Sequence, residues 1–459
     1  GRYKDALALI KKDNPFPAVC GHVCNRRCED ACTRGTIDEA IAIDEVKKFI
    51  AAQDLNAETR FIPEKVVPAT KGYFDEKIAI IGGGPSGLTS AYFLQLMGHQ
   101  CTVFEEKKQL GGMLRYGIPN YRFPRERLQE DINAILSTGV DVKLNTTIGT
   151  EELKQIQQEY DAIYVAIGAH TDKKLGLEGE DSKNVISAVD MLREIGDGAY
   201  PDYTGKRVVV VGGGNVAMDC ARTAMRANAE TVSIVYRRRQ EDMTALPAEV
   251  EGAIAEGIEL VTLKAPLRVE ADAEGNACAL WVQPQIIGPV KGGRPSPRKA
   301  NKPEERMECD IVLVAIGQDI VSGPFADFGM AVNRGRIAAD KGGAANMVGV
   351  YAGGDCVSGP ATVIKAIAAG KAAAANIDEY LGYHHPISCD VEIPEPMLND
   401  KVPCGRVNLQ EVEAWARKTN FEGIELPMSC EEAVQEASRC LRCDRHGCGT
   451  LRGGREFEW

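Results

Sequence analysis

The chain has 459 residues, a length typical of about three domains. Its formal net charge of −12 argues against a nucleic-acid-binding surface. No apolar run approaches the roughly 20 residues that a membrane span requires, and no secretory signal is visible, so we expect a cytoplasmic protein without a membrane span.

The first predicted domain, residues 1–70, is helical and carries four closely spaced cysteines. Because residue 1 is Gly and a helical pattern begins there, we expect this domain to be incomplete at its N-terminus. Its cysteines follow a C-x3-C-x3-C-x3-C pattern: Cys20, Cys24, Cys28 and Cys32. Four soft thiolates at this spacing favour a [4Fe–4S] cluster. Zinc, which usually selects C-x2-C pairs, and unliganded thiols remain alternatives, and one cysteine can serve a neighbouring cluster.

Residues 71–195 are predicted to form the first part of an FAD-binding domain. A buried strand, Lys77 to Ile81, runs into the turn GGGPSG and a helix, and the next strand ends at Glu105. Gly82 permits the tight turn, Gly84 lets a pyrophosphate approach, and Gly87 lets helix and strand pack. Pro85 and Ser86 open the helix, whose N-terminus attracts phosphates. Glu105 is expected to accept hydrogen bonds from the hydroxyls of a ribose.

Two further segments favour a flavin at this site. The sequence LGGMLR supplies Gly112, Met113 and Arg115, in a stretch where the backbone is expected to pass close to the ring. Residues 319–385 contain VYAGGD, whose Gly354 and Asp355 precede a helix opened by Thr362. That helix N-terminus is suited to stabilising a reduced flavin. Since this segment lies far downstream, the FAD domain is predicted to be split by an inserted domain.

The inserted domain, residues 196–318, repeats the nucleotide pattern. The strand RVVVV is followed by GGGNVA, which supplies Gly212, Gly214, Asn215, Val216 and Ala217. The next strand ends in Tyr236, Arg237 and Arg238 where an acid would favour NAD(H), so we predict NADP(H) over NAD(H). A solvated strand end is the alternative for the arginines. The Gly- and Pro-rich stretch from Lys291 to Arg306 is interpreted as a solvated hairpin loop.

The last segment, residues 386–459, is a cysteine-bearing extension. Its cysteines are spaced C-x9-C-x2-C-x4-C: Cys430, Cys440, Cys443 and Cys448. The Cys440-Leu-Arg-Cys443 pair indicates a second iron–sulfur cluster or a zinc ion. Free or partner-shared thiols remain open.

Taken together, these motifs resemble the glutamate synthase small-subunit family, which includes the large subunit of bifurcating ferredoxin:NADP transhydrogenase and the N-terminal part of dihydropyrimidine dehydrogenase. The resemblance extends to about residue 385 and rests on NPFPAVCGHVC, IGGGPSGLTSAYFL, GGMLRYGIPNYRFP, GGGNVAMDCAR, VYRRRQEDM and YAGGDCVSGPATVIKAI. It implies FAD at Gly82–Gly87 and Asp355, NADPH at Gly212–Ala217 with Arg237 and Arg238, and iron–sulfur clusters in the N-terminal domain. The family's upstream cysteine motif is absent, and Lys47 stands where some members have a Glu or Gln ligand, which leaves the ligand set open.

We therefore expect an α/β oxidoreductase with two Rossmann-like domains behind a helical iron–sulfur domain. It would pass a hydride between NADPH and FAD, and single electrons between FAD and clusters toward other redox subunits of a complex or a ferredoxin. No side chain is predicted to act as a catalytic acid or base. A stand-alone NADPH:acceptor reductase and a non-catalytic scaffold of a redox complex are the alternatives.

Overall fold

A computed structural model describes residues 1–55, 60–66, 74–396 and 402–446. The predicted ligand Cys448 lies outside these residues. Within them, we find no helix with the length and apolar character needed to cross a bilayer.

The first sheet is parallel and has five strands in the order β18-β4-β1-β2-β3. Its strands are β1 (Lys77–Ile81), β2 (Gln100–Phe104), β3 (Asp141–Lys143), β4 (Ala162–Val165) and β18 (Val350–Ala352). Because β18 pairs with β4 across nearly 200 residues of sequence, this domain is split as predicted.

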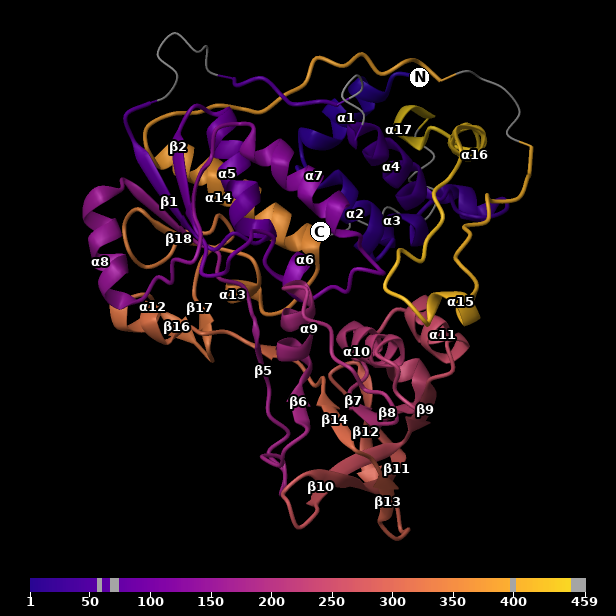
Figure 1. Ribbon diagram of the computed structural model, residues 1–459. Coiled ribbons are helices and arrows are strands. Elements are labelled where there is room, and N and C mark those ends of the chain that lie inside the picture. Colours follow the sequence, from indigo (N-terminus) through magenta and orange to yellow (C-terminus); the bar gives the residue numbers. More distant parts are fainter. Residues whose placement is uncertain (56–59, 67–73, 397–401, 447–459) are drawn as a thin grey trace.

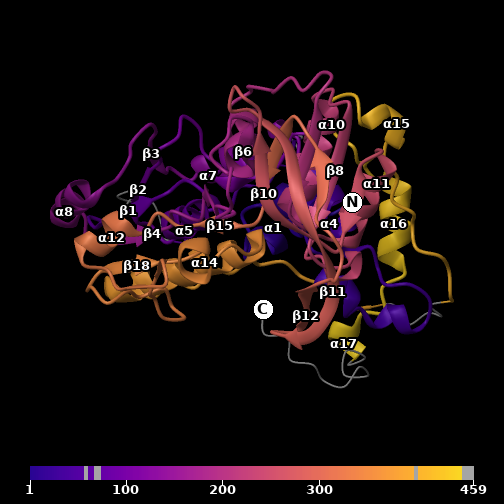
Figure 2. The ribbon, with the colours of Figure 1, turned by 90° about the horizontal axis from the view of Figure 1, so that it is seen from below.

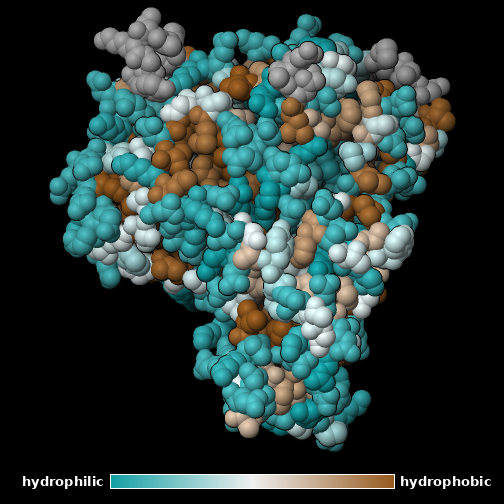
Figure 3. Space-filling model, in the orientation of Figure 1, coloured by the Kyte–Doolittle hydropathy of each residue, from teal (hydrophilic) through white to brown (hydrophobic). Residues whose placement is uncertain are grey.

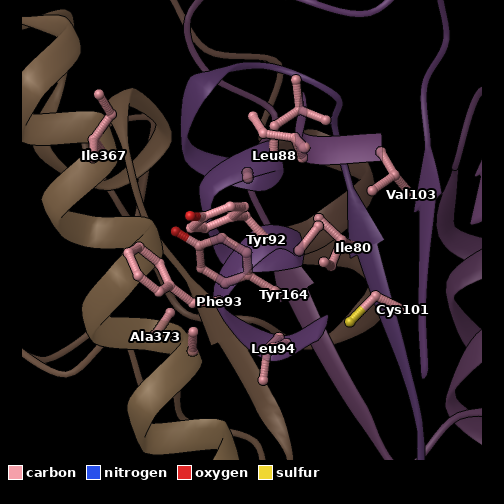
Figure 4. Close-up of a cluster of buried hydrophobic side chains, with 14 of the residues drawn as sticks. Ile80, Leu88, Tyr92, Phe93, Leu94, Cys101, Val103, Tyr164, Ile367 and Ala373 are labelled. Atoms are coloured by element: carbon pink, nitrogen blue, oxygen red, sulfur yellow. The ribbon is translucent and has the colours of Figure 1, made fainter. Parts of the chain in front are cut away.

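Side chains alternate between two cores along β1, as a strand buried on both faces requires. Ile78 and Ile80 face the core that contains α5 (Pro85–Leu96) and α14 (Val363–Tyr380), whereas Ala79 and Ile81 face a second core. Figure 4 shows the first of these, with Tyr92 and Phe93 of α5 between the strands and α14. The two helices pack closely because a Cβ at Gly370 would stand 2.3 Å from the Ser86 carbonyl oxygen.

The second sheet, also parallel, has the order β6-β14-β7-β8-β9. Its strands are β6 (Val185–Ser187), β7 (Arg207–Val211), β8 (Thr231–Tyr236), β9 (Glu259–Thr262) and β14 (Ile311–Val314). Along β7, Val208 and Val210 pack toward the helices, and Val209 and Val211 pack toward an antiparallel sheet on the other face. The helices are α9 (Ala188–Gly196), α10 (Asn215–Arg226) and α11 (Pro247–Ala255), and the antiparallel strands are β10 (Lys264–Ala271), β11 (Ala277–Lys291), β12 (Arg294–Lys299) and β13 (Glu305–Glu308).

The chain passes between the two sheets twice, at the short antiparallel pair β5 (Thr171–Asp172) and β15 (Gln318–Asp319). Figure 1 shows the second sheet as a separate lower lobe. Since β6 belongs to this lobe, sheet membership favours a domain boundary before residue 196. The domain boundaries themselves remain predictions.

The N-terminal helices and the C-terminal extension pack against these two domains. The N-terminal helices are α1 (Tyr3–Lys11), α2 (Pro17–Val23), α3 (Arg27–Asp30) and α4 (Ile43–Ala52), with 3₁₀ turns Thr33–Thr36 and Gln53–Leu55. The extension contributes α15 (Ala414–Arg417), α16 (Cys430–Ser438) and α17 (Cys443–His446). α2 contacts α7 (Arg125–Leu136), and α16 contacts α4. Figures 1 and 2 show α16 beside the N-terminal helices in both views.

The remaining elements connect or cover these parts: α6 (Met113–Tyr116), α8 (Thr150–Glu159), α12 (Gly323–Phe328), α13 (Asp355–Ser358), the hairpin β16 (Val332–Asn333) and β17 (Arg336–Ile337), and the 3₁₀ turn Gln240–Asp242.

Candidate dinucleotide and cluster sites

A cavity lies at the carboxyl end of the first sheet, where a ligand of an open α/β sheet is expected. It brings together eight of the predicted residues: Gly82, Gly84, Pro85, Ser86, Glu105, Gly112, Met113 and Asp355. These come from four separate segments of the chain, including the one beyond the inserted domain. The cavity therefore joins the two halves of the split domain.

The three glycines of the first turn have separate physical roles. Gly82 has φ +110°, and a Cβ there would stand 2.5 Å from the carbonyl oxygen of Ala166. A Cβ at Gly87 would stand 2.0 Å from the oxygen of Gly82, so Gly87 lets the helix pack and does not line the cavity. At Gly84 the nearest atom is the Gly112 Cα, at 3.7 Å. The space beside Gly84 is open to a ligand, which fits a dinucleotide pyrophosphate.

Glu105 is buried and held in a fixed orientation. Its Oε2 accepts the Gly83 N–H at 2.7 Å, and its Oε1 accepts the Lys107 N–H at 2.8 Å. Burial raises the pKa of Glu105, although these two backbone donors oppose the rise. A carboxylate held in this way keeps lone pairs free for further donors, which fits the two hydroxyls of a ribose.

Asp355 also lines the cavity, and burial raises its pKa to about 6. Four predicted residues lie outside the lining: Gly87, Arg115, Gly354 and Thr362. Arg115 is buried, and its guanidinium donates to the Leu110 carbonyl at 2.8 Å and to Gln129 Oε1 at 2.8 Å. The arginine thus fixes the loop that carries Gly112. Sequence reasoning did not select several other lining residues: Tyr116, which lies within the GGMLRYGIPNYRFP segment, and Thr146, His170 and Arg193, which stand in no motif.

A second cavity, of about 770 Å³, lies at the carboxyl end of the second sheet. Its lining includes Gly212, Gly214, Asn215, Val216, Arg237 and Arg238 as predicted. Ala217 is fully buried and would contact a Cβ at Gly212, so it packs the turn. No Asp or Glu lines this cavity within the described residues, whereas Lys173, Arg237, Arg238 and Arg294 do. The lining therefore suits a phosphorylated ligand.

The predicted cluster ligands Cys20 to Cys32 lie on and between α2 and the 3₁₀ turn that begins at Thr33. Cys20 is 4% exposed, and the other three thiols are half-buried. The Arg26 N–H points at Cys24 Sγ, 3.4 Å away, with Arg26 at φ 53°. Backbone donors of this kind stabilise a thiolate that binds iron, so the segment fits a cluster. Lys47 pairs with Asp44 at 2.7 Å, and an ammonium offers no lone pair to a metal.

The C-terminal cysteines share one feature with the N-terminal group, a backbone N–H that points at a cysteine sulfur. The Arg442 N–H points at Cys440 Sγ, 3.5 Å away, with Arg442 at φ 52°. Cys430, however, begins α16, and its Sγ lies 3.5 Å from the Tyr3 hydroxyl. At ~1.5 Å per residue, α16 separates it from Cys440 by about 15 Å. The structure thus does not bring Cys430 to the Cys440–Cys443 turn.

A zinc tetrathiolate would hold its sulfur atoms about 3.8 Å apart, given Zn–S bonds of ~2.3 Å. Across the described ranges, the one group of three or more potential ligand atoms within 4.8 Å is His99, Asp378 and His385. Asp378 accepts from His99 at 2.7 Å and from His385 at 2.9 Å, so hydrogen bonds account for that group. No three described cysteines have a preformed zinc geometry.

Comparison with known proteins agrees with this architecture. The pyridine nucleotide-disulphide oxidoreductase family matches residues 76–370. The chain belongs to this family. A second match, to dihydropyrimidine dehydrogenase domain II with its 4Fe-4S cluster, covers residues 1–59. Both matches support the predicted FAD, NAD(P)H and [4Fe–4S] cofactors and identify the protein as an NAD(P)H-dependent oxidoreductase.

Several relatives of this oxidoreductase are named as subunits or chains of enzymes that use NADP(+) or NADPH. The chain is 37% identical over 490 residues to the beta subunit of NADP(+)-dependent formate dehydrogenase from Moorella thermoacetica, covering 99% of this chain and 69% of that one. It is 36% identical over 488 residues to the beta subunit of NADPH-Fe(3+) oxidoreductase from Geobacter sulfurreducens, covering 97% and 72%. The glutamate synthase [NADPH] small chain of Escherichia coli is 32% identical over 408 residues, covering 83% and 84%.

Solved structures confirm the fold of the two-domain core. Mycobacterium tuberculosis FprA in complex with NADPH superposes with a TM-score of 0.58 at 20% identity, covering 67% of this chain and 85% of that one. Thioredoxin reductase of Lactococcus lactis gives 0.52 at 19% identity, covering 67% and 99%. Within this core, Cys101, Cys220, Cys309 and Cys356 are buried. Cys278 is half-buried, and its carbonyl accepts the Cys309 N–H at 3.2 Å.

Proposed function

We propose that this oxidoreductase exchanges a hydride between NADPH and FAD and passes single electrons through a [4Fe–4S] cluster to a partner redox subunit. The observation that carries the proposal is the contrast between its two dinucleotide cavities. One is lined by the fixed carboxylate of Glu105, and the other is lined by arginines and, among the described residues, by no Asp or Glu. One chain thus offers a flavin site and a phosphorylated-coenzyme site, joined to a cluster domain.

The residues of the chain bind and orient the reactants, and no acid or base is required. Gly84 and Gly112 would admit the FAD pyrophosphate, Glu105 would hold the ribose, and Asp355 would face the ribityl hydroxyls. FAD, when bound, supplies the coupling between two-electron and one-electron transfer. The arginines of the second cavity would hold NADPH, and the paired strands β5 and β15 would set the approach of the two domains.

Partner subunits are proposed from the names of the relatives, two of which are beta subunits of larger enzymes. The cluster domain and the Cys440–Cys443 turn lie together with α16 and α4. This places both thiol groups on the same part of the molecule, where a partner subunit or a ferredoxin could take electrons.

The proposal is tested by purifying the protein anaerobically and measuring flavin, iron and labile sulfide. We expect bound FAD with iron and sulfide, bleaching of the flavin by NADPH, and much slower bleaching by NADH. Co-purification of redox subunits from the native host would support the complex. A protein that retains flavin but is not reduced by NADPH would contradict the proposed electron donor.

A further inference from the structure

The hairpin of β11 and β12 contributes an arginine to the coenzyme cavity. The hairpin turns at Gly292 and Gly293, which have φ of +57° and +80°, and the first residue beyond them is Arg294. Arg294 lines the cavity with Arg237 and Arg238 of the β8 end. The sequence separates Arg294 from these residues by more than 50 positions, and only the tertiary structure joins them.

Two hydrogen bonds hold the hairpin against the β8 end. Arg238 Nε donates to the Pro295 carbonyl at 2.9 Å, and the Arg294 guanidinium reaches the Asp242 carbonyl at 3.5 Å. Figure 2 shows β12 extending from the long strand β11. In Figure 3, the visible face of this lower lobe is mostly hydrophilic, with small apolar patches. The hairpin is thus positioned as one wall of the cavity.

The charge around this wall is unbalanced. The neighbouring Arg239 is paired with Asp242 at 2.9 Å and with Glu241 at 2.8 Å. In contrast, no carboxylate pairs with Arg237, Arg238 or Arg294 among the described residues. Three guanidiniums on one acid-free wall favour a dianion, and guanidiniums bind phosphate oxygens in a forked geometry.

We propose that Arg294 binds the 2′-phosphate of NADPH together with Arg237 and Arg238, so that coenzyme choice depends on the hairpin as well as on the strand end. This inference rests on the proposed function and names a further residue of the same site. Because Arg294 comes from a separate element, its place beside Arg237 and Arg238 depends on the position of the hairpin.

The test compares binding of 2′,5′-ADP and 5′-AMP to the FAD-loaded protein by titration calorimetry at fixed salt. Both ligands carry a single 5′-phosphate, so the ratio of their dissociation constants isolates the 2′-phosphate. We expect Arg294→Gln to weaken binding of 2′,5′-ADP about tenfold and to leave binding of 5′-AMP nearly unchanged. Arg294→Lys keeps the positive charge but cannot donate two parallel hydrogen bonds. It should therefore weaken 2′,5′-ADP binding less than Arg294→Gln does.

Arg298→Gln is the matched control, because Arg298 is exposed on the same strand and does not line the cavity. It should leave the ratio unchanged. Wild-type preference for 2′,5′-ADP that persists in Arg294→Gln, or an equal weakening of both ligands, would overturn the inference and leave the proposed function standing. Equal binding of both ligands by the wild-type protein would overturn the NADPH assignment itself.

Discussion

Gly84 and Gly87 stand three positions apart, yet the structure separates their roles. A Cβ at Gly87 meets the main chain at 2.0 Å, whereas a Cβ at Gly84 has only an ordinary contact, at 3.7 Å. Gly84 also has φ −83°, which any residue can adopt. A substitution at Gly84 therefore tests ligand approach without disturbing the fold.

We predict that Gly84→Ala folds normally and binds FAD about tenfold or more weakly, since an added methyl group in a tight contact costs roughly 1–3 kcal/mol. Flavin stoichiometry after gel filtration and thermal unfolding of the apoprotein would measure the two effects. Gly87→Ala is the contrast and should destabilise the apoprotein itself. Full flavin content in Gly84→Ala would contradict the proposed pyrophosphate site.

Arg237 and Arg238 make a second prediction at this scale. Changing both to Gln should raise KM for NADPH by about tenfold to a hundredfold and change KM for NADH little, because one or two charge-assisted contacts are lost. Steady-state reduction of an artificial acceptor measures both values. Arg239→Gln is the control, since Arg239 is already paired with Asp242. An equal response of both coenzymes would show that Arg237 and Arg238 do not contact the 2′-phosphate.

Glu256 joins elements that the sequence keeps apart. This fully buried carboxylate follows α11 and pairs with Arg222 and Arg226 of α10 at 2.7 and 2.6 Å, and with Arg417 of the C-terminal α15 at 2.9 Å. Beside it, the ring of Tyr121 in the first domain stacks under the Arg226 guanidinium, with 3.8 Å between the ring centroid and Arg226 Cζ. The cluster thus connects the coenzyme domain to both the FAD domain and the extension.

We predict that Glu256→Gln lowers the free energy of unfolding by roughly 3–5 kcal/mol, because three buried guanidiniums would lose their shared partner. Chemical denaturation monitored by circular dichroism would measure the loss. Glu251→Gln on the exposed side of α11 should change stability little. A loss in Glu256→Gln no larger than in that control would mean that the cluster adds no stability.

The same residue predicts a pH dependence. Burial alone would raise the pKa of Glu256, but hydrogen bonds from Arg226 and Arg222 outweigh it and hold the pKa at about 2. Because an unfolded Glu has a pKa of about 4.3, this stabilisation is complete above that pH and is lost as the pH falls toward 2. Unfolding midpoints of wild type and Glu256→Gln should therefore converge in this acid range. A difference between the two unfolding midpoints that stays constant down to pH 2 would contradict the lowered pKa of Glu256.

On the scale of the molecule, the cluster domain is separate from the dinucleotide sites but packs on the FAD domain. The Val19 N–H donates to Asp131 of α7 at 3.0 Å, which ties α2 to that domain. In the proposed electron path, this domain would carry electrons between the flavin and a partner subunit.

We predict that Cys24→Ser with Cys28→Ser removes iron and retains FAD and NADPH binding. NADPH should still bleach the flavin, while transfer to the physiological acceptor falls to background. Cys278→Ser, outside both thiol groups, is the control. Transfer at the wild-type rate in the double variant would place the cluster off the electron path.

The extension offers a similar test. Truncation would remove Arg417 and disturb the buried charge cluster, so point variants are sharper. Cys440→Ser with Cys443→Ser should reduce the metal content, whereas Cys430→Ser should not, because α16 holds Cys430 about 15 Å away. Elemental analysis of the purified variants measures this. A reduced metal content in Cys430→Ser would restore the ligand set predicted from spacing.

The sequence by itself determined the two nucleotide turns, the split of the FAD domain and the thiol-rich ends. Strand runs such as RVVVV, glycine turns and cysteine spacing depend on only a few neighbouring residues, so the structures that they form can be recognised from the sequence alone. The tertiary structure decided which side chains reach a cavity: it turned Arg115 inward to hold a loop, brought Arg294 to the arginines of β8 and moved Cys430 away from Cys440. These outcomes depend on packing between segments distant in the chain, and local periodicity carries no information about such contacts.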